Sequence, residues 1–285
     1  MSWVMRAGTR QVEFGDDLSG LGLMSTPAVS IDFDAEMRVN PRGDGRRVGR
    51  DTIAGQSVSL MVEARPDHRA LPDVVRELLS VWRADEVRHT GGKLATLTSP
   101  DGLTAYGRPR PVGPDQQYRL FDVARAELVF ECVDDLWYGP AVSKEIGFTP
   151  VVTGGLPIPA AVPFVLGGGG GEADFTVDVG GDVTTWPVFE ISGPITDPYI
   201  EVVGVGRLVF RGVVAYDQTL EVDTRPWARW VLRNGAAFPG ALHPSGARLS
   251  DMGLKPGSYQ VFFGGYDPSG TSRMTVTVAP AYTSF

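Results

Sequence analysis

The sequence predicts a mainly β protein with two domains, and three observations support this. The chain of 285 residues contains 36 Gly and 22 Pro, a proportion typical of proteins with many turns and short strands. Alternating apolar and polar residues recur along the chain, whereas an apolar stripe at helical spacing occurs once. Residues 146–171, rich in Pro and Gly, separate a charge-dense part from a charge-poor part. We therefore expect a first domain at 1–145, a connector at 146–171 and a second domain at 172–285.

The composition excludes several classes of protein. Hydrophobic residues make up 42% of the chain, which is enough for a core, and the net charge of −8 argues against a general nucleic-acid binder. A single cysteine, Cys132, rules out an intrachain disulfide and a cysteine-based zinc cage. No apolar run is long enough to cross a membrane, and no secretion signal is recognisable, so we expect synthesis in the cytoplasm. Abundant Arg and Gly beside scarce Lys and Asn indicate a GC-rich genome.

The first domain begins with short strands and contains the one expected helix. The apolar stripe from Leu71 to Trp82 has a 3.6-residue period and predicts a helix over about 71–84. Pro72 and Asp73 suit the first turn of such a helix. Alternation predicts strands at Val4–Arg6, Gln11–Phe14, Val29–Phe33, Val58–Ala64, Leu94–Thr98, Leu103–Tyr106 and Phe121–Val133.

A polar segment, Asn40–Arg50, interrupts this pattern of strands. It contains glycines and four arginines, Arg42, Arg46, Arg47 and Arg50, and we interpret it as a mobile arm or a long hairpin. Two interpretations of the arginines stay open. They lie on a solvated arm, or they contact a second subunit.

The second domain consists of strands and turns. About eight strands follow one another at a spacing of roughly ten residues, with no helical period between them, which favours an antiparallel β-sandwich. Turn signals include Gly180-Gly181-Asp182 and Asn234-Gly235. The expected strands are Phe175–Val179, Val188–Ile191, Tyr199–Val203, Arg207–Val214, Thr219–Val222, Trp230–Arg233, Gly257–Gly264 and Arg273–Val278.

A search for catalytic, cofactor and metal sites finds no convincing constellation. The three histidines, His68, His89 and His243, are far apart in the sequence and show no ligand spacing. Cys132 lies within an alternating strand, which favours a buried apolar cysteine over a nucleophile. The carboxylate pairs Asp134-Asp135 and Glu221/Asp223 are equally well explained as solvated strand ends. We expect no enzyme activity, no cofactor and no metal.

Aromatic residues of the second domain suggest one further possibility. Trp227, Trp230 and Tyr266 would form a surface on which sugar rings stack, if their side chains lie together and exposed. Aromatic residues on sandwich strands also serve as core or as protein interface, and both interpretations stay open.

Two stretches of the chain resemble the distal tail proteins of siphophages. The first is the end of the long strand, where Val133–Pro140 carries an acidic residue, an aromatic pair and glycine in the order typical of that family. The single helix and the segment 44–51 before it are also similar. The second is the ordered series Pro187–Ile200, Leu220–Thr224, Leu232–Gly235 and Leu254–Tyr259.

This resemblance implies a fold and a role. It implies a β-rich belt domain with one helix, followed by a galectin-like sandwich, and a hexameric ring closed by the belt domains. The ring would join the tail tube to the tail-tip hub at the distal end of a long, non-contractile phage tail. Expected partners are further copies of the chain, the major tail tube protein, the hub or tail-associated protein, the tape measure protein and receptor-binding proteins. Membrane insertion and specific nucleic-acid binding are not expected. The alternative is a carbohydrate-binding β-sandwich module for attachment to the host surface.

Overall fold

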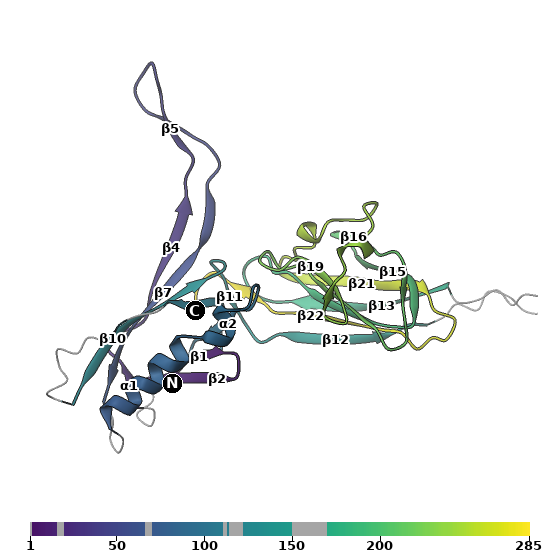
Figure 1. Cartoon of the computed structure of the whole chain (residues 1–285). Coiled ribbons are helices and arrows are strands. Elements are labelled where there is room, and N and C mark those ends of the chain that lie inside the picture. Colours follow the sequence, from purple (N-terminus) through teal and green to yellow (C-terminus); the bar gives the residue numbers. More distant parts are fainter. Residues whose placement is uncertain (1, 16–19, 66–69, 111–112, 114–121, 150–169) are drawn as a thin grey trace, which may run out of the picture. The chain divides into compact units, whose positions relative to one another are not determined.

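The computed structural model describes residues 2–15, 20–65, 70–110, 113, 122–149 and 170–285. The chain divides into two compact units, of which unit 1 comprises Met1–Tyr138 with Thr283–Phe285, and unit 2 comprises Gly139–Tyr282. Strands dominate both units, so the predicted mainly β class is confirmed (Figure 1).

Unit 1 is built on one antiparallel sheet with the strand order β2-β1-β8-β9-β10-β7-β3. Gly15, which follows β2, donates its N–H to the carbonyl of Leu21 in β3 at 2.8 Å, so the sheet nearly closes on itself. β4 pairs with the first part of β7, and β11 pairs with β9. The bounds are β1 Trp3–Ala7, β2 Arg10–Phe14, β3 Leu21–Leu23, β4 Ala28–Asp34, β7 Thr52–Ala64, β8 Ala95–Thr98, β9 Thr104–Arg110, β10 Ala124–Cys132 and β11 Trp137–Tyr138.

The predicted helix is present as α1, Leu71–Trp82. The buried side chains of the helix lie along its apolar stripe. At the end of the helix, the Trp82 indole N–H donates to the carbonyl of Arg110 at 2.8 Å. The helix ends two residues before the expected position because Ala84 adopts a left-handed conformation with φ of 49°. A second, short helix that the sequence did not predict, α2 (Asp85–Arg88), follows directly.

The last residues of the chain belong to unit 1. The ring of Phe285 packs edge-on against Trp3 and Trp137, with both pairs of ring centroids 4.9 Å apart. Trp3 and Trp137 also contact each other, so three aromatic side chains from distant parts of the sequence form one cluster.

Unit 2 is a sandwich of two antiparallel sheets. One sheet has the order β12-β22-β14-β18-β19-β20, and the other has the order β13-β21-β15-β16 with β17 beside β15. The core between them contains fully buried Phe189, Ile200 and Phe263. A β-sandwich is therefore confirmed, whereas its likeness to galectins stays a prediction. The bounds are β12 Val142–Gly147, β13 Gly170–Val179, β14 Val188–Ser192, β15 Ile195–Val202, β16 Gly206–Val209, β17 Val213–Val214, β18 Thr219–Asp223, β19 Trp230–Arg233, β20 Ala236–Ala237, β21 Gly257–Tyr266, β22 Arg273–Val278 and β23 Ala281–Tyr282, with 3-10 turns at Pro239–Ala241 and Leu249–Asp251.

The division between the units falls at a different place from the cut proposed on the sequence. The proposed cut after Glu145 lies inside β12, which pairs with β22 along its whole length and so belongs to the sandwich. Phe148 is buried in the sandwich core, although the sequence analysis placed it in the connector. Residues 150–169 of the expected connector lie outside the described residues, and its last two residues, Gly170 and Gly171, begin β13.

One predicted strand of unit 2 is broken. The expected strand Arg207–Val214 is divided into β16 and β17, because Gly212 adopts φ of 111° and donates its N–H to the Asp197 carboxylate at 2.8 Å. The chain therefore turns between the two short strands, and both of them pair with β15.

Candidate assembly surface

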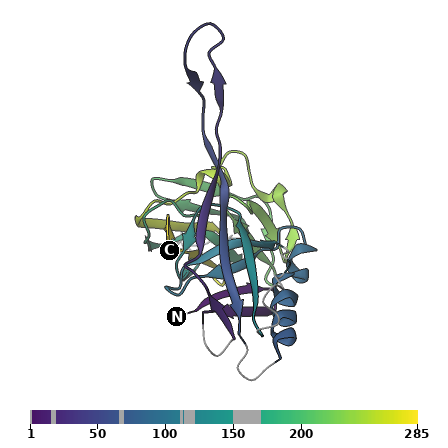
Figure 2. The ribbon, with the colours of Figure 1, turned by 90° about the vertical axis from the view of Figure 1, so that its left-hand side faces the viewer.

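A long antiparallel hairpin projects from unit 1 (Figures 1 and 2). Its lower part is formed by β4 and the first half of β7, and its tip by β5 (Met37–Val39) and β6 (Arg46–Val48). Every side chain of β4, β5 and β6 is exposed. The sequence predicted an arm or long hairpin at Asn40–Arg50, and the structure shows a hairpin.

Local backbone features explain how the hairpin forms. Asn40 donates its N–H to the carbonyl of Gly45 at 3.1 Å, and Gly45 has φ of 95°, so the turn at the tip is closed around a left-handed glycine. At the lower end, a Cβ on Gly55 would lie 2.9 Å from the carbonyl oxygen of Cys132. A glycine at this position therefore lets β7 pass close to the end of β10.

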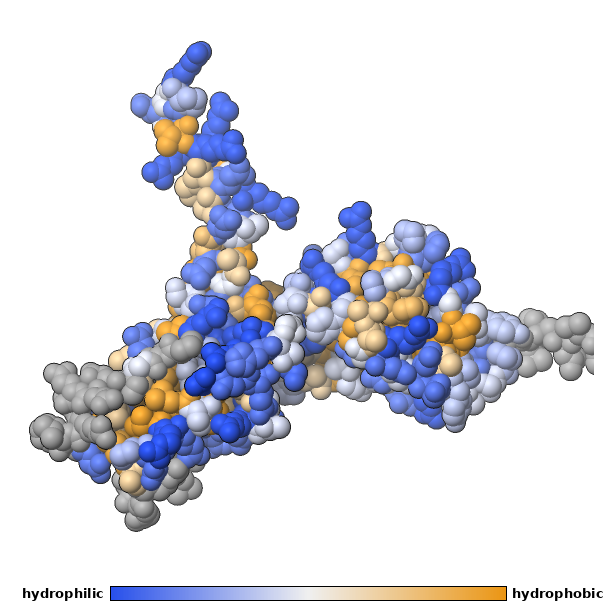
Figure 3. Space-filling model, viewed as in Figure 1, coloured by the Kyte–Doolittle hydropathy of each residue, from blue (hydrophilic) through white to orange (hydrophobic). Residues whose placement is uncertain are grey.

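The hairpin exposes large apolar side chains along its length. The exposed fractions of Phe33, Val39 and Val48 are 66%, 73% and 65%. Figure 3 shows apolar side chains spaced among hydrophilic ones on the projecting part. A two-stranded ribbon with no covered face is marginally stable in water, and exposed apolar groups mark contact sites. These features are typical of an element that packs against another protein chain.

The four arginines singled out in the sequence lie together at the tip. Arg42, Arg46, Arg47 and Arg50 are all exposed. Residues 37–50 contain five arginines and one acidic residue, Asp44, so this segment carries a formal charge of +4. Within the described part of the chain, none of the four arginines forms an ion pair. Contact between these arginines and a second subunit stays a prediction.

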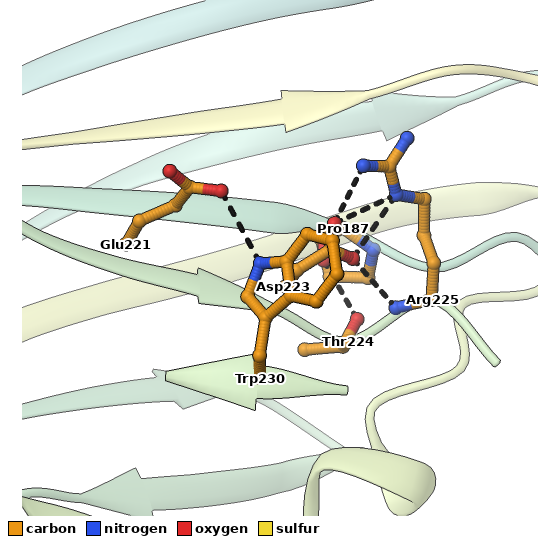
Figure 4. Close-up of polar contacts among 6 residues, drawn as sticks. All are labelled: Pro187, Glu221, Asp223, Thr224, Arg225 and Trp230. Carbon is orange, nitrogen blue, oxygen red and sulfur yellow. Dashed lines mark hydrogen bonds and ion pairs between the residues drawn. The ribbon is translucent and has the colours of Figure 1, made fainter. Parts of the chain in front are cut away.

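The aromatic residues proposed as a surface do not share one sheet. Trp230 lies on β19, and its indole N–H donates to the Glu221 carboxylate at 3.3 Å (Figure 4). Trp227 lies near it in sequence, with the Arg225 guanidinium carbon 5.6 Å from its ring centroid. Tyr266 is 51% exposed at the end of β21, which belongs to the other sheet of the sandwich. Trp230 and Tyr266 therefore lie on different sheets of the sandwich, and a shared stacking surface with Trp227 stays a prediction.

The nearby carboxylates are engaged in structural contacts. Asp223 is fully buried, and its carboxylate accepts hydrogen bonds from the Arg225 side chain at distances from 2.5 to 3.1 Å (Figure 4). The Thr224 hydroxyl donates to the carbonyl of Pro187 at 2.6 Å. Glu221 thus links β18 to β19 through Trp230, whereas Asp223 holds the side chain of Arg225 just beyond the end of its own strand.

The other residues considered for chemistry are also accounted for structurally. Burial, with a smaller contribution from Asp134, raises the pKa of the Cys132 thiol to about 12, so the thiolate is suppressed at neutral pH. His243 contacts the Ser245 hydroxyl at 2.7 Å, His89 ends α2, and His68 lies outside the described residues. Among the residues that the structure describes, no group of three or more His, Cys, Asp or Glu is placed to hold a metal. No helix in the same residues is long and apolar enough to span a membrane.

Sequence comparison identifies no relative. No family model matches the chain, and no curated protein matches it either. Solved structures do match. The Dit protein (gp 19.1) of phage SPP1, described as a paradigm of the hub adsorption apparatus in phages that infect Gram-positive bacteria, superposes with a TM-score of 0.54 at 15% identity. The match covers 98% of each chain.

This chain has the Dit fold. A second match supports this, since a chain of the phage P2 baseplate in its activated conformation with Ca superposes with a TM-score of 0.52 at 11% identity. That match covers 97% of each chain, and the same baseplate with Sr gives a TM-score of 0.50. The Dit fold therefore includes both units of this protein and confirms the resemblance to distal tail proteins at the level of the fold.

Proposed function

We propose that this protein is a structural component of a phage virion, a homo-oligomeric ring at the distal end of the tail. The observation that supports this most strongly is the match to the SPP1 Dit chain, because it covers 98% of both chains and so extends over both units. Fold alone does not determine function, and the surface of the molecule adds an independent argument.

The projecting hairpin supports an assembly role. It carries exposed apolar side chains and a cluster of arginines, and it extends from unit 1 without a covering layer. In a cyclic assembly, one face of each subunit binds a different face of its neighbour. A projecting element that docks on the next copy provides such an interface. We propose six copies per ring, as the resemblance to distal tail proteins implies.

The ring joins the tail tube to the tail-tip hub in this proposal. Its neighbours are the major tail tube protein on one side and the hub or tail-associated protein on the other, together with the tape measure protein and receptor-binding proteins. The tail is long and non-contractile, and the function resides in contact surfaces and not in catalysis. In the described part of the chain, no group of three or more His, Cys, Asp or Glu is placed to hold a metal, and burial keeps the Cys132 thiol protonated.

Immunogold labelling of intact virions tests this location. Antibodies raised against the purified protein are expected to place gold particles at the free end of the tail, at a single position per particle. Labelling along the tube or on the capsid would contradict the proposal. Virions that carry an epitope-tagged major tail tube protein provide the control, because their label should follow the whole tail.

A further inference from the structure

The two ends of unit 2 are fixed side by side. Gly139, its first residue, donates its N–H to the carbonyl of Pro280 at 2.8 Å, and a Cβ on Gly139 would lie 3.0 Å from the Cγ of Pro280. Ala281 is fully buried, and its carbonyl accepts the N–H of Asp182 at 2.9 Å. The segment that follows unit 2, Thr283–Phe285, therefore starts from a fixed point close to Gly139.

The ring that this segment carries completes the aromatic cluster of unit 1. Trp3 in β1 and Trp137 in β11 are buried, and Phe285 contacts both rings edge-on at 4.9 Å. Trp137 lies two residues before the start of unit 2, and Phe285 lies three residues after its end. The chain thus leaves unit 1 directly after this cluster and returns to the cluster after a complete second unit.

Aromatic side chains continue from this cluster to the helix. Trp3 is the direct cross-strand partner of Phe14 in β2, so their side chains lie on the same face of the sheet. The ring of Phe14 packs edge-on against Trp82 at the end of α1, with the ring centroids 6.0 Å apart. The Trp82 indole is in turn fixed by its hydrogen bond to the carbonyl of Arg110. An aromatic series of Phe285, Trp3, Phe14 and Trp82 therefore joins the segment after unit 2 to the helix of unit 1.

We propose that Phe285 is a strap that couples the packing of unit 1 to the folding of unit 2. While unit 2 is folded, its adjoining ends hold the Phe285 ring next to Trp137, so docking of the ring costs little entropy. When unit 2 unfolds, the same docking must close a flexible loop of about 140 residues, which lowers the effective concentration of the ring on the order of a hundredfold. Unit 1 then loses this ring, and its packing loosens along the aromatic series as far as α1. The coupling is a property of a single chain and does not depend on the proposed ring of subunits.

Hydrogen exchange of the full chain tests the docking of Phe285. Phe285→Ala is expected to raise the exchange rates of amides in β1 and α1 at least about tenfold, whereas Phe285→Leu, which keeps most of the apolar volume, should have a smaller effect. Because coupling between two sites is reciprocal, amides of β14 and β18 in unit 2 should also exchange faster in Phe285→Ala. Tyr216→Ala is the matched control, because this aromatic side chain of unit 2 is 78% exposed and should change neither unit. An effect confined to unit 1 would show that Phe285 only fills space there, and it would overturn the coupling.

A double-variant comparison tests the coupling from the side of unit 2. Arg225→Ala removes the partner of the buried Asp223, and it should raise amide exchange in α1 about tenfold at urea concentrations that unfold unit 2 of this variant. Thr224→Val, which removes the hydroxyl bonded to the carbonyl of Pro187, is a milder change of the same kind. In the Phe285→Ala background, neither substitution should raise exchange in α1 further. Equal increases in α1 with and without Phe285 would overturn the proposal, and so would exchange in α1 that does not change when unit 2 unfolds.

Discussion

The carboxylate of Asp223 is fully buried, and its charge is balanced by an ion pair with Arg225. Removing the partner of a buried charge leaves that charge uncompensated, so Arg225→Ala is expected to lower the free energy of unfolding of unit 2 by about 3–5 kcal/mol. The matched control is Arg211→Ala, since Arg211 and Asp197 form an ion pair at 3.1 Å with both side chains exposed. That control should cost less than about 1 kcal/mol. Equal losses in urea denaturation would contradict this assignment.

Asp134 makes the stability of unit 1 depend on pH. Burial raises the pKa of its carboxyl from 3.8 to about 6, although the Tyr138 hydroxyl donates to it at 2.6 Å. The folded protein therefore binds a proton that the unfolded chain releases between these two values. As the pH falls from 7 through 6 towards 4, this group should increase the free energy of unfolding by about 2–3 kcal/mol.

Asp134→Asn is the variant that isolates this effect, because the amide has the same shape and does not ionise. The difference in unfolding free energy between wild type and variant should change between pH 7 and pH 4 in favour of the wild type. A difference that is constant over this range would show that Asp134 does not titrate there. Asp267 does not interfere, since hydrogen bonds from Ser269 and Ser272 outweigh its burial and lower its pKa to about 2.

At this scale, sequence analysis identified residues but not their partners. Glu221 and Asp223 were interpreted as a carboxylate pair or as solvated strand ends, but Asp223 at the end of β18 is fully buried. The burial of Asp223 was not predictable, because it depends on the ion pair with Arg225, which lies just after the strand. Similarly, the four tip arginines were recognised from composition, whereas the length of the hairpin that carries them arises from the pairing of β4 with β7.

We expect the hairpin to contribute little to the stability of the monomer and much to assembly, so the two contributions can be measured separately. Its β4, β5 and β6 side chains are exposed, so replacing Val39 and Val48 with Ser is expected to change the free energy of unfolding of the monomer by less than about 0.5 kcal/mol. The same change removes apolar contact area in the assembly, and it should shift the protein towards monomer. Denaturation and light scattering on one preparation measure both quantities.

The control for this prediction is a similar change on unit 2. Val203 and Val213 are also exposed, at 46% and 57%, and their replacement with Ser should leave the oligomer unchanged. Loss of assembly in this control, or an oligomer that survives the substitutions at the tip, would contradict the role of the hairpin.

Most elements with a buried face were predictable, whereas of the fully exposed strands β4, β5 and β6 the sequence pattern predicted only β4. The apolar period predicted α1, and alternation predicted β10 and β14, because each of them buries every third, fourth or second side chain. β12 was missed because five of its six side chains are exposed, so it shows no apolar alternation. The hairpin was predicted in part, as a strand at Val29–Phe33 and an arm at Asn40–Arg50, but the exposure of its apolar side chains was not, because apolar alternation is normally a sign of burial.

For the whole molecule, unit 2 should fold by itself. Its core residues, from Phe148 to Val278, all lie within Gly139–Tyr282, and both of its sheets are complete within this range. We expect the fragment 139–282 to unfold cooperatively. The fragment 146–282, which starts at the cut proposed from the sequence, lacks most of β12 and exposes the edge of β22. It should be less stable and more prone to aggregate. Identical unfolding curves for the two fragments would contradict the observed boundary.

The number of subunits in an assembly is determined by the contact surfaces of the molecule, and such surfaces leave few motifs in a sequence. Resemblance to distal tail proteins led to the fold, and the projecting hairpin is the surface that we propose for contacts between copies. The most direct test of the central claim is the mass of the purified full chain in solution, measured by light scattering, with negative-stain images of the same peak. The account predicts a species of about 184 kDa, six times the chain mass of 30.6 kDa, with a central hole. A single species at the mass of one chain at all concentrations would contradict it.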